Sequence, residues 1–251
     1  MTQAEKHIIN NLFECWQYVG QHSRTLATTP SYKTVTPVGS DWPERVFDIT
    51  PGDDGAILFK EMAVAITEQR LPRLLTFTAT ESSRYEAALA AAGFVPRMKQ
   101  MGMIIDLAQV VLPEIPGACT FKAVTNAEEA TLFATIAGES FGYRVDGYMT
   151  RSLLQPDQRA QLFIGYYEAA PACCGLVFYD EQGYAGLHMI GTLPAFRGKG
   201  LAAAITIHLL QQCQKDQRLQ VVLHASAAGE PIYTRLGFKP EKEVITWHQA
   251  S

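Results

Sequence analysis

The chain has 251 residues, of which 47% are hydrophobic and 18% are charged, and its formal net charge at pH 7 is −4. This composition is typical of a globular protein with one large or two modest buried cores, and the acidic balance argues against nucleic-acid binding. No apolar run reaches the roughly 18 residues of a membrane span, and Met1–Lys6 has no signal-peptide pattern. We therefore expect a cytoplasmic protein without a membrane partner.

In the first half, apolar residues at helical spacing predict an amphipathic helix around Ile8, Leu12 and Trp16. Further elements follow in chain order: strands at Tyr32–Val38 and Arg45–Ile49, a helix at Ala56–Glu68, a strand at Leu74–Thr80, a helix with Tyr85 that leads to Gly93-Phe94, and a strand at Met101–Asp106. Two prolines and a glycine in Leu112–Gly117 then interrupt the pattern. We expect a domain boundary there, between 1–113 and 118–251.

The second half reads as an alternation of strands and helices. The predicted strands are Cys119–Val124, Gln161–Glu168, Cys174–Asp180, Tyr184–Thr192, Leu219–Ala225 and Glu243–His248, with a turn at Ala169–Ala172. The predicted helices run from the N-cap Asn126 to Ser140 and over Gly147–Leu154, Gly200–Lys215 and Glu230–Leu236. This order predicts an α/β fold, with a mixed sheet and helices packed on it.

The order strand, helix with a tyrosine, Gly-Phe and strand occurs in both halves. It predicts a degenerate internal duplication.

The five cysteines include no Cys-x-x-Cys pair, so neither a disulfide framework nor a metal site is expected. Adjacent Cys173 and Cys174 are predicted to be small buried side chains of a strand.

A glycine-rich turn at Arg197–Ala202 joins the predicted strand Tyr184–Thr192 to the next helix. Glycine permits a tight turn and a close approach of a ligand to the backbone. The first turn of the helix offers unpaired N–H groups and the positive end of a dipole. Together these features predict an anion site that suits a pyrophosphate.

The pattern Arg197-x-x-Gly200-x-Ala202, followed by Tyr233-x-x-Leu-Gly-Phe238, resembles the two motifs of the GCN5-related N-acetyltransferase (GNAT) superfamily. The resemblance covers about residues 118–251 and implies the GNAT fold, with 1–113 as a degenerate second copy that has no such loop. It implies direct transfer of an acetyl group from acetyl-CoA to the amine of a small or amino-acid-like molecule.

The same resemblance assigns roles by position. Tyr233 would donate a proton to the departing CoA thiolate, and Ser226 stands where the family often has Asn. The cofactor contacts it implies are Ile190, Gly191, Thr192, Arg197, Gly198, Lys199, Gly200, Leu201, Ala202, Ala203 and Ser226.

The family's frequent basic carboxylates map to Gly186 and Val221, which cannot accept a proton. His188 lies two residues after Gly186 on the same strand face and is the candidate base. A packed histidine without a chemical role is the alternative. His224 is predicted to pack or to be exposed, and His208 to be structural or exposed.

Acceptor recognition is expected from Phe141, Tyr143, Arg144 and Tyr148, with Arg144 holding a carboxylate, although a plain connecting segment is the alternative. An acyl-CoA-binding sensor without turnover is the competing function. A third reading, from other tandem versions of the fold, is acyl transfer to peptides. The expected partners are acetyl-CoA and a small amine, with no metal, in a monomer or homodimer.

Overall fold

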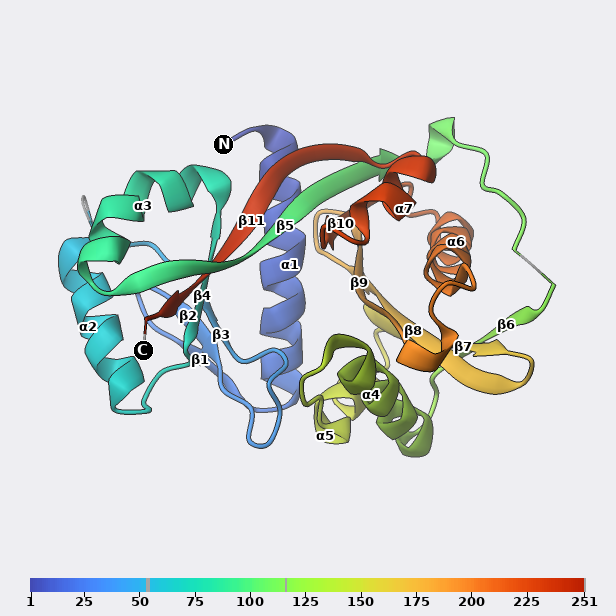
Figure 1. Ribbon diagram of the computed structural model, residues 1–251, viewed down its shortest axis with the longest axis horizontal. Helices are drawn as coiled ribbons and strands as arrows, with labels where there is room; N and C mark the ends of the chain where they lie inside the picture. Colours follow the sequence, from blue (N-terminus) through green and yellow to red (C-terminus); the bar gives the residue numbers. More distant parts are fainter. Residues whose placement is uncertain (53–54, 116, 251) are drawn as a thin grey trace.

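The computed structural model describes residues 1–52, 55–115 and 117–250 (Figure 1). The first half contains α1 (Gln3–His22), β1 (Leu26–Thr28), β2 (Lys33–Val35), β3 (Arg45–Phe47), α2 (Ala56–Thr67), β4 (Leu74–Thr78), α3 (Ala79–Ala91) and β5 (Phe94–Asp106). The second half contains β6 (Cys119–Ala123), α4 (Ala127–Phe141), α5 (Gly147–Arg151), β7 (Ala160–Tyr167), β8 (Ala170–Tyr179), β9 (Ala185–Thr192), α6 (Leu201–Lys215), β10 (Gln220–Ala225), α7 (Glu230–Arg235) and β11 (Lys239–Gln249).

All strands join one mixed, 11-stranded sheet in the order β1-β2-β3-β4-β11-β5-β10-β9-β8-β7-β6. The last strand of each half crosses to the other half: β5 pairs with β10, and β11 pairs with β4. The two crossing strands also pair with each other, and in Figure 1 they arch together from one half to the other. The described halves therefore share one sheet.

The pairing pattern repeats on both sides of the central β5–β11 pair. In the first half, β1, β2 and β3 pair antiparallel, and β3 pairs parallel with β4. In the second half, β7, β8 and β9 pair antiparallel, and β9 pairs parallel with β10. The two halves therefore have the same order of antiparallel and parallel strand pairings on either side of the β5–β11 pair.

The predicted α/β class and most predicted elements are confirmed, with four differences. The short strand β1 has no counterpart among the predictions, and β5 and β11 extend well beyond the predicted Met101–Asp106 and Glu243–His248. The turn expected at Ala169–Ala172 is shorter, because Glu168 and Ala169 adopt left-handed backbone angles and β8 starts at Ala170. Thr80 belongs to α3, whose N-cap is Thr78.

Helices cover both faces of the sheet. α1 and α4 share a core with alternate residues of β7 and β8, such as Leu176 and Phe178, while α6 packs against the opposite residues, such as Val177. Cys174 faces the first core and Cys173 the second, and both are fully buried, as predicted. No described helix combines the length and the apolar character needed to cross a lipid bilayer.

Candidate functional site

Two neighbouring parallel strands separate near the middle of the sheet. β9 and β10 are paired at Ala185–Val221, Gly186–Val222 and Leu187–Leu223. Beyond this point both strands continue, β9 to Thr192 and β10 to Ala225, without further pairing between them. Met189 has a left-handed φ of 52°, which marks an irregularity in β9 at this point. The divergence leaves one backbone edge of β9, from His188 to Thr192, without a strand partner among the described residues.

The glycine-rich turn lies directly after this open edge. Gly198 and Gly200 adopt left-handed φ values of 79° and 77°, and a Cβ on either would meet no atom within 4 Å. Gly200 is the N-cap of α6 and provides no side-chain cap. Within the described chain, none of the backbone amides from Gly198 to Ala203 donates to another residue. The turn therefore presents a row of free N–H donors at the positive end of a 15-residue helix.

The side chains around the turn hold it in place. Arg197 donates from Nη2 to the Ser140 carbonyl at 2.8 Å, so its guanidinium ties the turn to the end of α4. The ammonium of Lys199 lies 4.8 Å from the centre of the Tyr167 ring. Ser226 Oγ accepts from the Gly229 amide at 3.2 Å. The side chains of Arg197 and Ser226 are thus engaged within the protein, whereas the amides of the turn and the Lys199 ammonium donate no hydrogen bond to any described residue.

A pocket of about 450 Å³ opens at the point of divergence. Residues from both halves of the chain line this pocket. The second half contributes Phe141, Tyr143, Leu187, His188, Met189, Ile190, Leu223, His224, Ser226, Tyr233 and Thr246. The first half contributes Leu12, Cys15, Trp16, Trp42, Arg45, Leu74, Arg97, Met98 and Gln100. The first half therefore supplies a large part of the wall.

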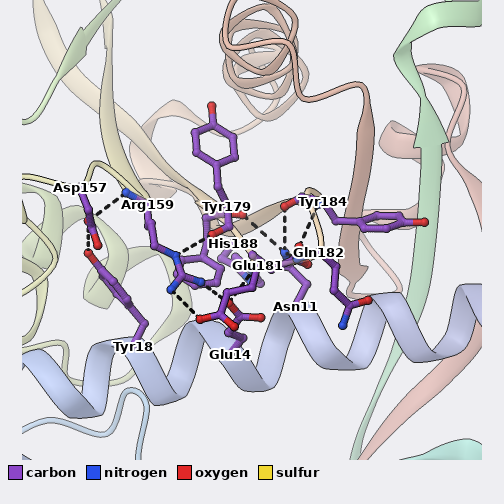
Figure 2. A network of polar contacts seen from close by, with 12 residues as sticks. Asn11, Glu14, Tyr18, Asp157, Arg159, Tyr179, Glu181, Gln182, Tyr184 and His188 are labelled. Carbon is purple, nitrogen blue, oxygen red and sulfur yellow. Dashed lines mark hydrogen bonds and ion pairs between the residues drawn. The ribbon is translucent and has the colours of Figure 1, made fainter.

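His188 is held by a hydrogen-bonded chain that starts on α1. Asn11 Nδ2 donates to Asp180 Oδ2 at 2.9 Å, which turns Asn11 Oδ1 toward His188 Nε2 at 3.0 Å (Figure 2). Because that oxygen can only accept, His188 Nε2 must carry the hydrogen. The network thus assigns the lone pair of His188 to Nδ1, which has no hydrogen-bond partner among the described residues.

Further contacts fix α1 against the second half. Arg159 forms an ion pair with Glu14 and a second one with Glu181, and Tyr18 donates to Asp157 at 2.6 Å. Figure 2 shows the three α1 side chains Asn11, Glu14 and Tyr18 on the same side of the helix, facing these partners. Asn11 is therefore presented to His188 from a helix that is anchored along its length.

Gly186 explains the missing carboxylate of the family pattern. A Cβ at this position would overlap Asn11 Oδ1 and His188 Nε2 and would lie 2.7 Å from Asn11 Cγ. The amide of Asn11 therefore occupies the space that a side chain at 186 would need. Val221, the other position of a family carboxylate, is fully buried on the opposite face with the α6 core.

His224 lies beside His188, with ring centroids 6.3 Å apart and nearly parallel planes. It lines the pocket, which sequence reasoning did not foresee, and its two ring nitrogens are sealed and have no partner among the described residues. Burial lowers the pKa of His188 to about 4, and burial together with His188 lowers the pKa of His224 to about 3. Both imidazoles are therefore neutral at pH 7. His208 instead stacks on Phe121, outside the pocket.

The depressed pKa of His224 predicts an acid-sensitive fold. The unfolded chain takes up a proton near pH 6.5, whereas the folded chain resists it until about pH 3. The contribution of neutral His224 to the free energy of unfolding is therefore complete above pH 6.5 and is lost as the pH falls toward 3. Replacing His224 by Phe should reduce the loss of unfolding free energy between pH 6.5 and 4.5 by about 1–2 kcal/mol, measured by urea denaturation. Exposed His22→Phe is the control, and an equal effect there would contradict the assignment.

Tyr233 lies on α7 and is only 8% exposed, with its ring against Phe238. It lines the pocket, and its hydroxyl forms no hydrogen bond within the described chain. Burial raises its pKa to about 12, so the phenol stays protonated at neutral pH. The pocket thus contains both a neutral imidazole that can accept a proton and a phenol that can donate one.

The predicted acceptor segment divides into two parts. Phe141 and Tyr143 stack on each other at 5.5 Å and line the pocket. Arg144 and Tyr148 are not among the lining residues: Arg144 is exposed, with its backbone held by Asp41, and the Tyr148 hydroxyl donates to the Ser23 carbonyl. Two guanidiniums do line the pocket, those of Arg45 on β3 and Arg97 on β5.

No group of three or more His, Cys, Asp or Glu side chains suited to a metal ion is found in the described ranges. The residues that sequence reasoning missed, Asn11, Arg45 and His224, lie far apart along the chain. Only Asn11 carried a signal, since it interrupts the apolar face formed by Ile8, Leu12 and Cys15.

Comparisons with known proteins agree with this geometry. A family model described as an acetyltransferase (GNAT) domain matches residues 124–246. A GCN5-related N-acetyltransferase from Kribbella flavida is 18% identical, with 95% of each chain covered and a TM-score of 0.69. A similar protein from Sphaerobacter thermophilus is 16% identical, covers 81% of this chain and 71% of its own, and has a TM-score of 0.60.

A tandem GNAT protein from the clavulanic acid biosynthesis pathway is also similar, with 17% identity, 88% and 79% coverage and a TM-score of 0.57. The comparison with curated proteins finds no match. The identities are low enough that the structural likeness speaks for the fold alone. With the family match over residues 124–246 and the divergent strands beside a glycine-rich turn, the second half of the chain belongs to the GNAT superfamily.

Proposed function

We propose that the protein is an N-acetyltransferase that moves an acetyl group from acetyl-CoA to the amine of a small molecule. The observation that carries this proposal is one pocket, at the divergence of β9 and β10, lined by His188, Tyr233 and the open edge of β9. Such a pocket brings a proton acceptor and a proton donor to the place where an acyl thioester can lie along the strand edge.

The residues present fit the donor. The free amides from Gly198 to Ala203 suit a pyrophosphate, and each helix-terminus contact of this kind typically contributes about 0.3–1 kcal/mol. The open edge of β9 at Ile190, Gly191 and Thr192, on the side away from β8, suits the amides of a pantetheine arm. Acetyl-CoA supplies an activated thioester there. The side chains of Arg197 and Ser226 fix the shape of the turn and of the strand end, and the Lys199 ammonium adds a positive charge beside the free amides.

His188 and Tyr233 divide the proton transfers. His188 Nδ1 accepts the proton of the attacking amine, directly or through a water, while the new C–N bond forms. As the C–S bond breaks, the phenol of Tyr233 donates a hydrogen bond, and then its proton, to the thiolate. Proton transfers of this type typically contribute about 10²–10⁴-fold in rate.

The charge of the pocket also favours the reactive, neutral amine. Its lining includes Arg45 and Arg97 and, within the described residues, no Asp or Glu. Burial without a carboxylate partner lowers the pKa of an ammonium group. The pKa of His188 is low, so His188 is a weak base. It can serve here because the pocket also lowers the pKa of the substrate's ammonium group, which makes the neutral amine easier to form.

Free thiol release in mixtures of acetyl-CoA with a panel of amines tests the proposal. We expect amine-dependent release, with the acetylated amine as the second product. Tight acetyl-CoA binding without turnover across a broad panel would instead support a sensor, the competing function. No binding of acetyl-CoA would contradict both.

Asn11 gives a sharper test of the proton path. Replacing Asn11 by Leu removes the acceptor that fixes His188 Nε2–H, so the lone pair is no longer held at Nδ1. We expect kcat to fall about 10-fold or more, as is typical for partners that orient a reactive histidine, with acetyl-CoA affinity unchanged by calorimetry.

The control is Asn10→Leu, because Asn10 is the neighbouring, exposed asparagine of the same helix. In a His188→Gln background, Asn11→Leu should cause no further loss. A similar loss in both backgrounds would mean that Asn11 acts only on stability, and would remove it from the proton path.

We also propose that residues 1–113 are a degenerate second copy of the domain at 118–251. The repeated order of strand pairing supports this, as does the shared sequence β4-α3-β5 and β10-α7-β11. The sequence of the first copy has no Arg-x-x-Gly-x-Gly/Ala motif, so only one cofactor is expected for each chain. Its role is to complete the wall of the pocket.

A further inference from the structure

The guanidinium of Arg45 has no hydrogen-bond or ion-pair partner among residues 1–52, 55–115 and 117–250. Its Nε and Nη1 atoms are sealed from solvent and have no hydrogen-bond acceptor in the described chain. The guanidinium lies 5.1 Å from the Trp16 ring, and no described carboxylate forms an ion pair with it. A buried charge left unpaired is costly in free energy, so an ionised arginine at such a position calls for an anion from outside the protein.

The position of Arg45 is set by strand alternation. In β3, Val46 packs into the core around α2 and α3, whereas its neighbours Arg45 and Phe47 face α1. This is the face of the sheet from which Asn11 reaches His188. Arg45 therefore belongs to the pocket wall opposite the divergent strands.

Tyr143 connects Arg45 to the reacting groups. It lies close enough that the charge of Arg45 acts against the rise in the Tyr143 pKa that burial causes. Its hydroxyl lies 3.9 Å from the sulfur of Met189, the residue that follows His188. The guanidinium and the imidazole therefore line the same pocket, with Tyr143 near Arg45 and beside the residue that follows His188.

The remaining walls of that space are apolar and aromatic. Trp16, Trp42 and Phe141 line it, and Arg97 is the only other cationic side chain of the described lining that is always charged. Planar carboxylates match the guanidinium fork in two hydrogen bonds. A guanidinium set among apolar and aromatic walls therefore suits a planar carboxylate attached to an apolar or aromatic body.

We propose that Arg45 binds the carboxylate of the acceptor, so that the substrate is an apolar or aromatic amine that also carries a carboxylate, as amino acids do. The amine of this substrate class rests on the proposed acetyl transfer, whereas the carboxylate site at Arg45 does not depend on it. The specificity for the acceptor then comes from the first half of the chain, while the chemistry takes place on the second.

Binding without turnover tests the site by itself. The chain has three tryptophans, and two of them, Trp16 and Trp42, line the pocket, so tryptophan fluorescence reports on its occupation. We titrate 3-phenylpropionate, which has no amine, in the absence of acetyl-CoA. We expect saturable binding by the natural chain and at least about 10-fold weaker binding by Arg45→Met, as for loss of a charge-assisted pair.

Arg84→Met is the matched control, because Arg84 also lies 5.1 Å from an aromatic ring, that of Tyr85, but is exposed and outside the pocket. Thermal denaturation separates binding from folding. Without ligand, Arg45→Met should be as stable as the natural chain or more so, since it removes an unpaired charge. A less stable variant that keeps its affinity would show a structural arginine and overturn the proposal.

Paired acceptors then test the substrate class: phenylalanine against phenethylamine, tryptophan against tryptamine, and leucine against 3-methylbutylamine. We expect the carboxylated member to have the higher kcat/KM, and Arg45→Met to abolish that preference while sparing the amine without a carboxylate. No preference in any pair, or tighter binding of phenyl phosphate than of 3-phenylpropionate, would overturn the carboxylate site. Carboxylate binding without any acetylation would leave the site standing and refute the proposed acetyl transfer.

Discussion

Replacing Gly200 by aspartate is expected to weaken acetyl-CoA binding about 100-fold, or about 2.7 kcal/mol. Gly200 lies at the start of α6 with a left-handed φ, beside the free amides of the turn, and a Cβ there would meet no atom within 4 Å. A carboxylate there would occupy the space of the pyrophosphate and repel its charge. Isothermal titration calorimetry with acetyl-CoA measures the effect.

Two further variants separate the causes. Gly200→Asn has nearly the same shape, and Asn, like Asp, tolerates left-handed angles. It should therefore lose much less affinity than the aspartate variant. Gly93→Asp places the same residue at another open, left-handed glycine remote from the turn and should bind normally. Unchanged affinity in Gly200→Asp would mean that the turn does not hold the diphosphate.

Replacing Tyr233 by Phe should lower kcat about 100-fold, at the lower end for loss of a positioned proton donor, with acetyl-CoA affinity within about twofold. The hydroxyl has no partner in the described structure, so its removal costs the fold little. Steady-state rates together with a binding titration separate the two effects.

Tyr85→Phe is the matched control, because Tyr85 is also a buried tyrosine on a helix, but it lies on α3 of the first half in a separate core. Its kcat should equal that of the natural chain. If Tyr233→Phe also turns over at the natural rate, the thiolate receives its proton from another source.

The sequence predicted local structure well because its signals are local. The N-cap Asn126 and the spacing of Leu201, Ile205 and Leu209 each act within one helix, and both helices are present. The crossing of β5 and β11 could not be predicted in this way. Which strand lies beside β10 depends on contacts over more than 100 residues, as in the pairing of Val221 with Ile105, and local propensity carries no information about them.

In the candidate site, too, the residues that belong to local motifs could be predicted from the sequence, whereas those brought together by long-range strand pairing could not. The turn at Gly198–Gly200 and Tyr233 follow from motifs and lie at the pocket or beside it. Arg144, in contrast, was proposed for its neighbours in sequence, and it is the distant Arg45 that lines the pocket. The strand neighbours of His224 predict only packing or exposure. The closeness of its ring to His188 depends on the register of β9 against β10, which local sequence does not show.

The crossing strands have a consequence for any attempt to divide the protein. Residues 124–246, which match the family model, lack β5, the strand between β10 and β11. Expressed by themselves they would leave unpaired the edges of β10 and β11 that face β5, and such unprotected edges favour aggregation. For the same reason, a protease cut in the connection after β5 would leave two fragments that remain associated, each closing the other's sheet.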